Sequence, residues 1–210
     1  QLFFEKKARS VRYLTPTLTN GIATDRHLTH TSFKKLVKAQ LITGDAAKNI
    51  EYVRKQVIPK MFERRDNLLL GMRSKRLEVR IMFPKESLMI DFADPDEYTL
   101  ERYRHLIELF DDEEIDLEVR LLPGINAARL KAEGATFGLI FGAFPKPNVD
   151  VTLAYASQAT KNYFNIHLVE ANTETAQEKV YQFERYWASA ISEQESEAMI
   201  KQLYQGSQKV

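Results

Sequence analysis

The stretch LEVRIMFP, from Leu77 to Pro84, returns forty residues later as LEVRLLP, from Leu117 to Pro123. A related stretch, VRYLTP, lies at Val11–Pro16. Each contains an apolar run with a β-branched Val, and each ends at a Pro, which cannot donate a backbone hydrogen bond to a neighbouring strand. We therefore interpret all three as short buried strands. The Arg that follows each Val should alternate to the other face of its strand or lie near a strand end.

An amphipathic helical pattern precedes the second and third of these strands. One pattern covers residues 46–73, where Pro59 should kink or divide the helix. The other covers residues 96–110 and opens on DPDE, a plausible helix start. A helix before each strand is typical of right-handed βαβ units. We therefore expect the three Val-Arg strands to lie parallel in one sheet.

The second half of the chain has a different spacing. Its short apolar segments follow one another too closely for helical crossovers, so hairpins or tight turns should join them. These strands are expected at residues 127–130, 136–141, 149–155 and 163–169. A long helix is predicted for residues 173–191 and a short one for 193–204. The sequence thus predicts an α/β fold with a mixed, mostly parallel sheet and flanking helices.

Composition places broad limits on the class of protein. The 210 residues are 44% hydrophobic and 28% charged, with a formal net charge of +1, which argues against a whole-surface nucleic-acid binder. The sequence has no apolar run long enough for a membrane span, no secretory signal and no Cys, so we expect a cytoplasmic protein without disulfides or a thiolate nucleophile. Because the chain opens on Gln1, within what resembles a helix, we expect a fragment that lacks an upstream domain.

Three stretches resemble proteins of the phospholipase D-like fold. The pair MRSKRLEVRIMFP (Met72–Pro84) and DDEEIDLEVRLLP (Asp111–Pro123) is similar to that family's turn from a helix into a strand. VDVTLAYASQAT (Val149–Thr160) resembles its aspartate, short strand and small-residue turn. The stretch Asn162–Ala190 is similar to its final strand and its helix with a late Phe and Trp. The resemblance implies one phospholipase D-like domain over residues 1–192, followed by a C-terminal helix and tail over 193–210.

Catalysis in that family uses a His-x-Lys motif and an Asp: the His attacks phosphorus, the Lys holds phosphate oxygens and the Asp orients the imidazole. If Asp150 matches that Asp, the His and Lys should lie on TFGLIF at residues 136–141, which contains neither. A second register places Asn126, Ala128 and Glu133 in the three positions, again without the nucleophile. The chain therefore resembles a degenerate member with no catalytic residues, such as the effector-sensing domain of a TrmB-type transcription regulator.

The resemblance implies a pocket surrounded by polar residues beside the sheet. These ligand-binding candidates are Asp150, Ser157, Asn162, Asn165 and His167. Polar side chains next to an apolar sheet suit a small ligand, although Asn and Ser also favour turns, and a strand His is often simply paired and partly buried. No cofactor and no metal are expected.

A basic stretch from Lys60 to Arg76 offers a second kind of site. Its side chains suit either a solvated helix face or a phosphate or nucleic-acid contact. The candidates for such a contact are Arg64, Arg65, Arg73, Lys75 and Arg76. His27 and His30 have the spacing of a metal pair but no third ligand nearby in sequence, so we interpret them as solvent-facing, and we expect His105 on a helix surface.

The function predicted from these observations is a non-catalytic sensory or interaction domain of a larger regulatory protein, without membrane attachment. It would bind a small-molecule or protein effector, with nucleic acid bound through the missing upstream domain. A homodimer is expected because the chain has one half-site and because Phe183, Tyr186 and Trp187 offer a wide apolar face, although these aromatics could also pack on their own sheet. The alternatives are a phosphodiesterase or nuclease with unusual residues and a nucleic-acid-binding module.

Overall fold

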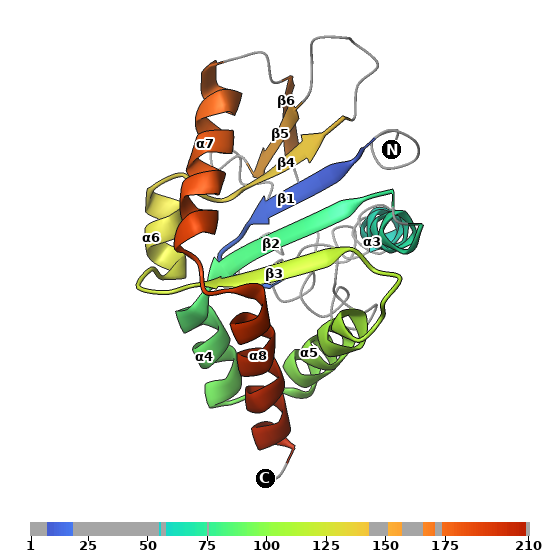
Figure 1. Cartoon of the computed structure of the whole chain (residues 1–210), viewed down its shortest axis with the longest axis vertical. Coiled ribbons are helices and arrows are strands. Elements are labelled where there is room, and N and C mark those ends of the chain that lie inside the picture. Colours follow the sequence, from blue (N-terminus) through green and yellow to red (C-terminus); the bar gives the residue numbers. More distant parts are fainter. Residues whose placement is uncertain are drawn as a thin grey trace, which may run out of the picture.

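The computed structural model describes residues 8–18, 55, 58–74, 76–142, 151–156, 166–170 and 174–208. Its strands form one sheet in the order β3-β2-β1-β4-β5-β6, with helices on both faces (Figure 1). The strands are β1 (Ser10–Leu14), β2 (Glu78–Pro84), β3 (Leu117–Leu122), β4 (Phe137–Phe141), β5 (Val151–Ala156) and β6 (Ile166–Glu170). The helices are α3 (Ile58–Arg73), α4 (Lys85–Ala93), α5 (Glu97–Phe110), α6 (Ala127–Ala132), α7 (Glu174–Ser189) and α8 (Glu193–Ser207).

The three Val-Arg segments are neighbouring parallel strands, which confirms the main fold prediction. Val11 of β1 lies opposite Val79 of β2, and Ile81 of β2 lies opposite Val119 of β3. All three Val side chains are buried in one core. Because successive side chains of a strand point to opposite faces, the Arg after each Val lies on the other face of the sheet.

The rest of the sheet is antiparallel, so the sheet is mixed as predicted, whereas a mostly parallel sheet is not confirmed. β4 runs antiparallel to β1, β5 to β4 and β6 to β5. Parallel pairing among the described strands is confined to β1, β2 and β3. The physical reason lies in the connections: parallel neighbours need a crossover of a dozen or more residues, and the short links after β4 and β5 allow only antiparallel pairing.

Two helices differ from the sequence prediction. The prediction of a strand at residues 127–130 is wrong, because these residues form α6. Asn126 caps this helix through its side-chain oxygen, which accepts from the Arg129 N–H at 2.9 Å. Helix α4 was not expected at all. It begins directly after Pro84, whose φ of −60° suits a helix start. The helix expected at residues 96–110 is confirmed as α5, and Asp96 caps it through a carboxylate that accepts from the Thr99 N–H.

The sheet separates two apolar cores. One contains the Val-bearing faces of β1, β2 and β3, packed against buried residues of α3, α4, α5 and α8, including Tyr103 and Ile200. The other lies on the Arg-bearing face and packs Phe183 and Trp187 of α7 and Leu130 of α6 against Met82 and other strand residues. Helix α7 therefore covers one end of the face that carries the three arginines (Figure 1).

The outer edge of β3 is closed by the junction between α7 and α8. The Leu121 N–H donates to Ser196 Oγ at 3.1 Å, and the Ile191 N–H donates to the Leu121 carbonyl at 2.9 Å. An unpaired strand edge is a template for unwanted pairing with other chains, so these bonds protect β3. They also hold the α7–α8 junction against Leu121, one residue before the end of β3.

Candidate functional site

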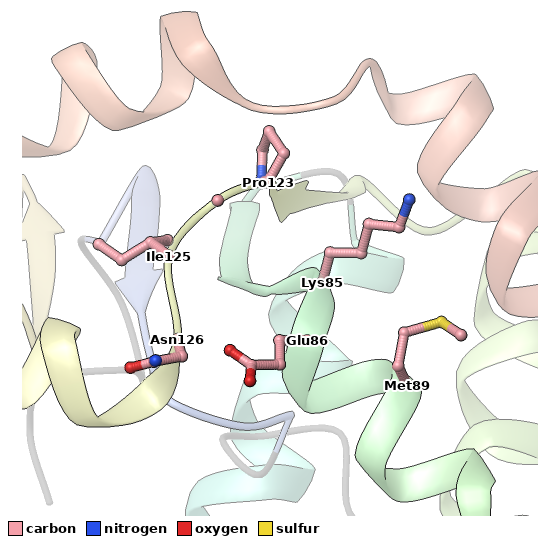
Figure 2. Close-up of a pocket in the computed structure, with 7 residues that line it drawn as sticks. Lys85, Glu86, Met89, Pro123, Ile125 and Asn126 are labelled. Carbon is pink, nitrogen blue, oxygen red and sulfur yellow. The ribbon is translucent and has the colours of Figure 1, made fainter.

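A groove lies at the carboxyl end of the parallel strands β2 and β3. It has a volume of about 470 Å³ and lies between the first turns of α4 and the loop that follows β3 (Figure 2). Its lining residues are Lys85, Glu86, Met89, Pro123, Gly124, Ile125 and Asn126. In open α/β sheets, ligands bind preferentially outside the carboxyl ends of the strands, so the groove occupies the position where a ligand is expected.

Local backbone chemistry forms both walls of this groove. Pro84 ends β2 and leads without a linker into α4, so Lys85 and Glu86 lie at the very start of a helix. On the other wall, Gly124 has φ of +70°, a conformation that a residue with a Cβ adopts only with strain. This Gly turns the chain after Pro123, and Asn126 then caps α6. The repeated strand-Pro ending thus produces two different turns that face each other.

The lining is suited to binding. Lys85 offers a cation, Glu86 a carboxylate and Asn126 an amide, while Met89, Pro123 and Ile125 contribute apolar surface. The α4 start has no side-chain cap among the described residues. Figure 2 shows Glu86 reaching toward the loop at Asn126, whereas Lys85 and Met89 extend to the other side of α4. The seven lining residues include no His, Ser, Thr, Cys or Tyr.

A network of polar side chains holds α4 in place. Ser87 Oγ donates to the Pro16 carbonyl at 2.7 Å, which ties the helix to the segment after β1. Asp91 of α4 accepts from Arg102 Nη2 at 2.6 Å and from the Tyr103 hydroxyl at 2.7 Å. Burial raises the pKa of Tyr103 well above its ordinary value, and the neighbouring Asp91 charge acts in the same direction. Tyr103 therefore remains a hydrogen-bond donor to Asp91, and these bonds anchor the helix that forms one wall of the groove.

The second cluster of charged residues is the arginine row, defined as Arg12, Arg80 and Arg120 on three neighbouring strands. Arg12 and Arg80 are register partners, and Arg120 lies opposite Met82, two residues beyond Arg80. Arg80 and Arg120 lie against Trp187 of α7, with guanidinium carbons 5.3 and 4.3 Å from a Trp187 ring centre. Stacking of Arg on Trp is a favourable cation–π contact.

Carboxylates balance the charge of the arginine row. Arg80 Nη2 lies 2.6 Å from Glu78 Oε1, and Arg80 Nε lies 3.5 Å from Glu118 Oε2. Arg120 Nη2 lies 2.6 Å from Glu118 Oε1. Arg12 pairs with Glu184, which comes from α7. The second residue of each Val-Arg repeat therefore builds the surface onto which α7 docks.

A third cluster joins α6 to α7. The Tyr186 hydroxyl donates to Glu133, which also accepts from Arg129 Nε at 2.8 Å. The bond from Tyr186 and the one from Arg129 lower the pKa of Glu133. Burial raises the pKa of Tyr186, and its bond to Glu133 adds to that rise. The lowered pKa keeps Glu133 ionised and the raised pKa keeps Tyr186 protonated at neutral pH, so the hydrogen bond between them is maintained. It is a structural connection between the two helices.

The pocket predicted from the sequence stays a prediction. Asp150, Ser157, Asn162 and Asn165 lie outside the described residues. The backbone of His167 lies in β6 opposite Tyr155 of β5, and its side chain is outside the described part of the chain. His27 and His30 are also outside it.

The basic stretch is partly neutralised by acidic neighbours. Arg65 donates to Asp66 through Nε and Nη2, and Arg73 lies 3.7 Å from an Asp112 carboxylate oxygen. Arg76 is exposed, while Lys75 and the side chain of Arg64 lie outside the described residues. His105 pairs with Glu108 at 3.5 Å on α5, on the helix surface as expected. Arg65 and Arg73 thus lie beside carboxylates, and the phosphate or nucleic-acid contact stays a prediction.

The groove was missed from the sequence although a signal was present. Lys85 follows one strand-ending Pro and Gly124 follows another, so the two residues had to meet at one edge of a parallel sheet. Within the described ranges, no group of three or more acidic or His residues is placed to hold a metal ion. None of the described helices is both long and apolar enough to cross a membrane.

Comparison of the chain with protein families, with curated proteins and with solved structures finds no match in any of the three.

Proposed function

We propose that this chain is a non-catalytic sensory or interaction domain of a larger regulatory protein, and that it binds a small ligand in the groove between α4 and the loop after β3. The observation that carries the proposal is the lining of the groove. It joins a cation, a carboxylate, an amide and apolar surface at the carboxyl end of parallel strands, and its seven lining residues include no His, Ser, Thr, Cys or Tyr. This combination suits recognition of a small polar molecule with an apolar part.

We further propose that the topology is phospholipase D-like and that the chain is related to the effector-sensing domains of TrmB-type regulators. Support comes from the parallel Val-Arg strands, the antiparallel strands that follow, and the late helix with Phe183 and Trp187 packed on the sheet. In such a protein a DNA-binding domain would lie upstream, and the ligand state of the groove would regulate it.

A homodimer remains part of the proposal, but its interface would use other residues than the aromatic side chains of α7 suggested by the sequence. Phe183 and Trp187 are buried in the chain's own core, so they are used by the sheet and do not offer a partner surface. The exposed large apolar side chains among the described residues, which could serve a second copy, are Leu70 of α3, Met89 and Ile90 of α4 and Tyr181 of α7. Light scattering decides the question: a mass near 24.3 kDa at every concentration would mean a monomer.

Amide NMR spectra of the whole chain test ligand binding. Inorganic phosphate, succinate and the zwitterion leucine are titrated separately as probes of the three kinds of lining group. We expect at least one probe to shift the amide signals of residues 85–89 and 124–126, and Lys85→Ala or Glu86→Ala to weaken that response. Lys131→Ala is the matched control, since Lys131 is an exposed cation on α6 outside the groove. No shift at the groove with any of the three probes would refute the assignment.

A phosphodiesterase assay tests the non-catalytic part of the proposal. We expect no hydrolysis of bis(p-nitrophenyl) phosphate above buffer, with or without Mg²⁺ or Mn²⁺. Turnover that is proportional to protein concentration and is lost on substitution of His27, His30 or His167 would instead support the enzyme alternative.

A further inference from the structure

The buried polar atoms of β1 indicate a second binding site under α7, separate from the groove. Ser10 is only 8% exposed, and its Oγ has no hydrogen-bond partner among the described residues. Arg12 Nε, on the same face two residues later, is buried and also lacks a hydrogen-bond partner within the described chain. Arg80 Nε, Arg102 Nε and Thr136 Oγ1 also lack a partner among the described residues, but Ser10 and Arg12 are two such groups on one face of the same strand. Buried donors are normally satisfied, so this pair points to an acceptor that the chain does not itself supply.

The Arg12 guanidinium is held in a fixed orientation by aromatic rings. Its central carbon lies 4.4 Å from the centre of the Phe141 ring and 5.7 Å from that of Phe183. Among the described residues, the charged partner of Arg12 is the Glu184 carboxylate, which accepts from Nη1. The edge of a guanidinium that contains Nε is one of the edges that can bind a carboxylate or phosphate through two parallel hydrogen bonds. On Arg12 that edge carries the orphan Nε.

Glu184 differs from the other carboxylates of the arginine row. Glu78 and Glu118 come from the sheet itself, whereas Glu184 comes from α7. Its side chain is 46% exposed, compared with 18% for Arg12. A half-exposed glutamate can rotate into solvent without any movement of the helix backbone, which would free the charge of Arg12 and open space beside it.

We propose that Arg12 and Ser10 form a binding site for a small oxyanion, a carboxylate or a phosphate, and that Glu184 is the chain's own competitor for this site. With Glu184 in place, its carboxylate partly neutralises Arg12. When an external oxyanion binds, it accepts from Arg12 Nε and Ser10 Oγ, and Glu184 turns outward. Arg80 and Arg120 retain their own carboxylates throughout, so Arg12 alone supplies the net positive charge.

NMR of the arginine Nε–Hε groups tests the site directly in the full chain. The Arg12 signal is assigned by its loss in Arg12→Lys. Phosphate and acetate are titrated separately, each against sodium chloride of equal ionic strength, so that the two arms distinguish a phosphate site from a carboxylate site. We expect the Arg12 Nε–Hε signal to shift in at least one arm and Ser10→Ala to weaken that binding.

The decisive comparison is Glu184→Gln against Glu178→Gln. Glu184→Gln should tighten binding about fivefold, the effect of removing one competing ion pair of partly exposed groups. Glu178 is an exposed acidic residue on the same helix, so its variant has the same change in net charge and should bind like the parent. Equal gains in both variants would show general electrostatics and overturn the proposal.

Two other results would also overturn it. One is an Arg12 signal that no anion moves in Glu184→Gln; the other is an Arg12 Nε–Hε group that contacts only a bound water. Lys85→Ala should leave binding at Arg12 unchanged, so failure of this site and failure of the groove can be distinguished.

Discussion

Replacing Phe183 by Ala should weaken the packing of α7 on the sheet. The Phe183 side chain is fully buried, stacks on Trp187 with ring centres 5.5 Å apart, and lies beside the Arg12 guanidinium. A buried Phe→Ala change costs about 3–5 kcal/mol because it loses transfer free energy and leaves a cavity. Since domains of this size are stable by only about 5–15 kcal/mol, we expect the free energy of unfolding to fall by about 4 kcal/mol.

The measurement is urea unfolding at 25 °C, followed by circular dichroism and by the emission of Trp187, which is the only Trp of the chain. In a separate thermal unfolding experiment, the melting temperature should fall by roughly 8–16 °C. Tyr181→Ala is the matched control, because Tyr181 is 71% exposed on the same helix, and it should change stability by less than about 0.5 kcal/mol. If Phe183→Ala and Tyr181→Ala differ by less than about 1 kcal/mol, the described packing of α7 is wrong.

Three further predictions concern polar contacts. Asp91→Ala should destabilise the fold by about 3 kcal/mol in urea unfolding, because it leaves the buried Arg102 without its carboxylate, whereas the exposed Asp94→Ala should have little effect. Ser196→Ala should speed hydrogen exchange of the Leu121 amide about tenfold, since that N–H loses its acceptor; an unchanged rate would contradict the closed edge of β3. Tyr186→Phe should raise the pKa of Glu133 toward its ordinary value in an NMR titration, because the Tyr186 hydrogen bond is the main cause of its lowering. With a lowered folded pKa, the contribution of Glu133 to stability is present above its unfolded pKa and is lost as pH falls through the folded value, and Tyr186→Phe should reduce that loss.

The parallel half of the fold was predictable from the sequence because its signal is local. Val11, Val79 and Val119 each sit in a short apolar run that ends at Pro, and a helix pattern precedes two of them. The helices α5, α7 and α8 were predictable for a similar reason, since their apolar residues recur at helical spacing. These elements follow from patterns that are complete within about fifteen residues.

The elements that were missed depend on information that is not local. Residues 127–130 are a short apolar run that suits strand or helix equally, and the Asn126 cap decided between them. Helix α4 has Met89 and Ile90 exposed beside buried Ser87 and Leu88, so its apolar residues do not form one clear stripe. The groove is formed by two turns almost forty residues apart, and only the pairing of β2 with β3 brings them together.

The Val-Arg repeat, with a Pro three or four residues after each Arg, locates three features of the molecule at once. The Val faces one core, the Arg faces α7, and the Pro ends the strand at the edge where the groove forms. A Lys in place of Arg would keep the charge but could not stack flat on Trp187. Because the Ile191 N–H binds the Leu121 carbonyl, two residues before Pro123, the end of α7 is fixed to the strand that leads into the groove. A ligand that shifts the loop after β3 would therefore act on α7, the helix that carries Glu184 and covers the arginine row.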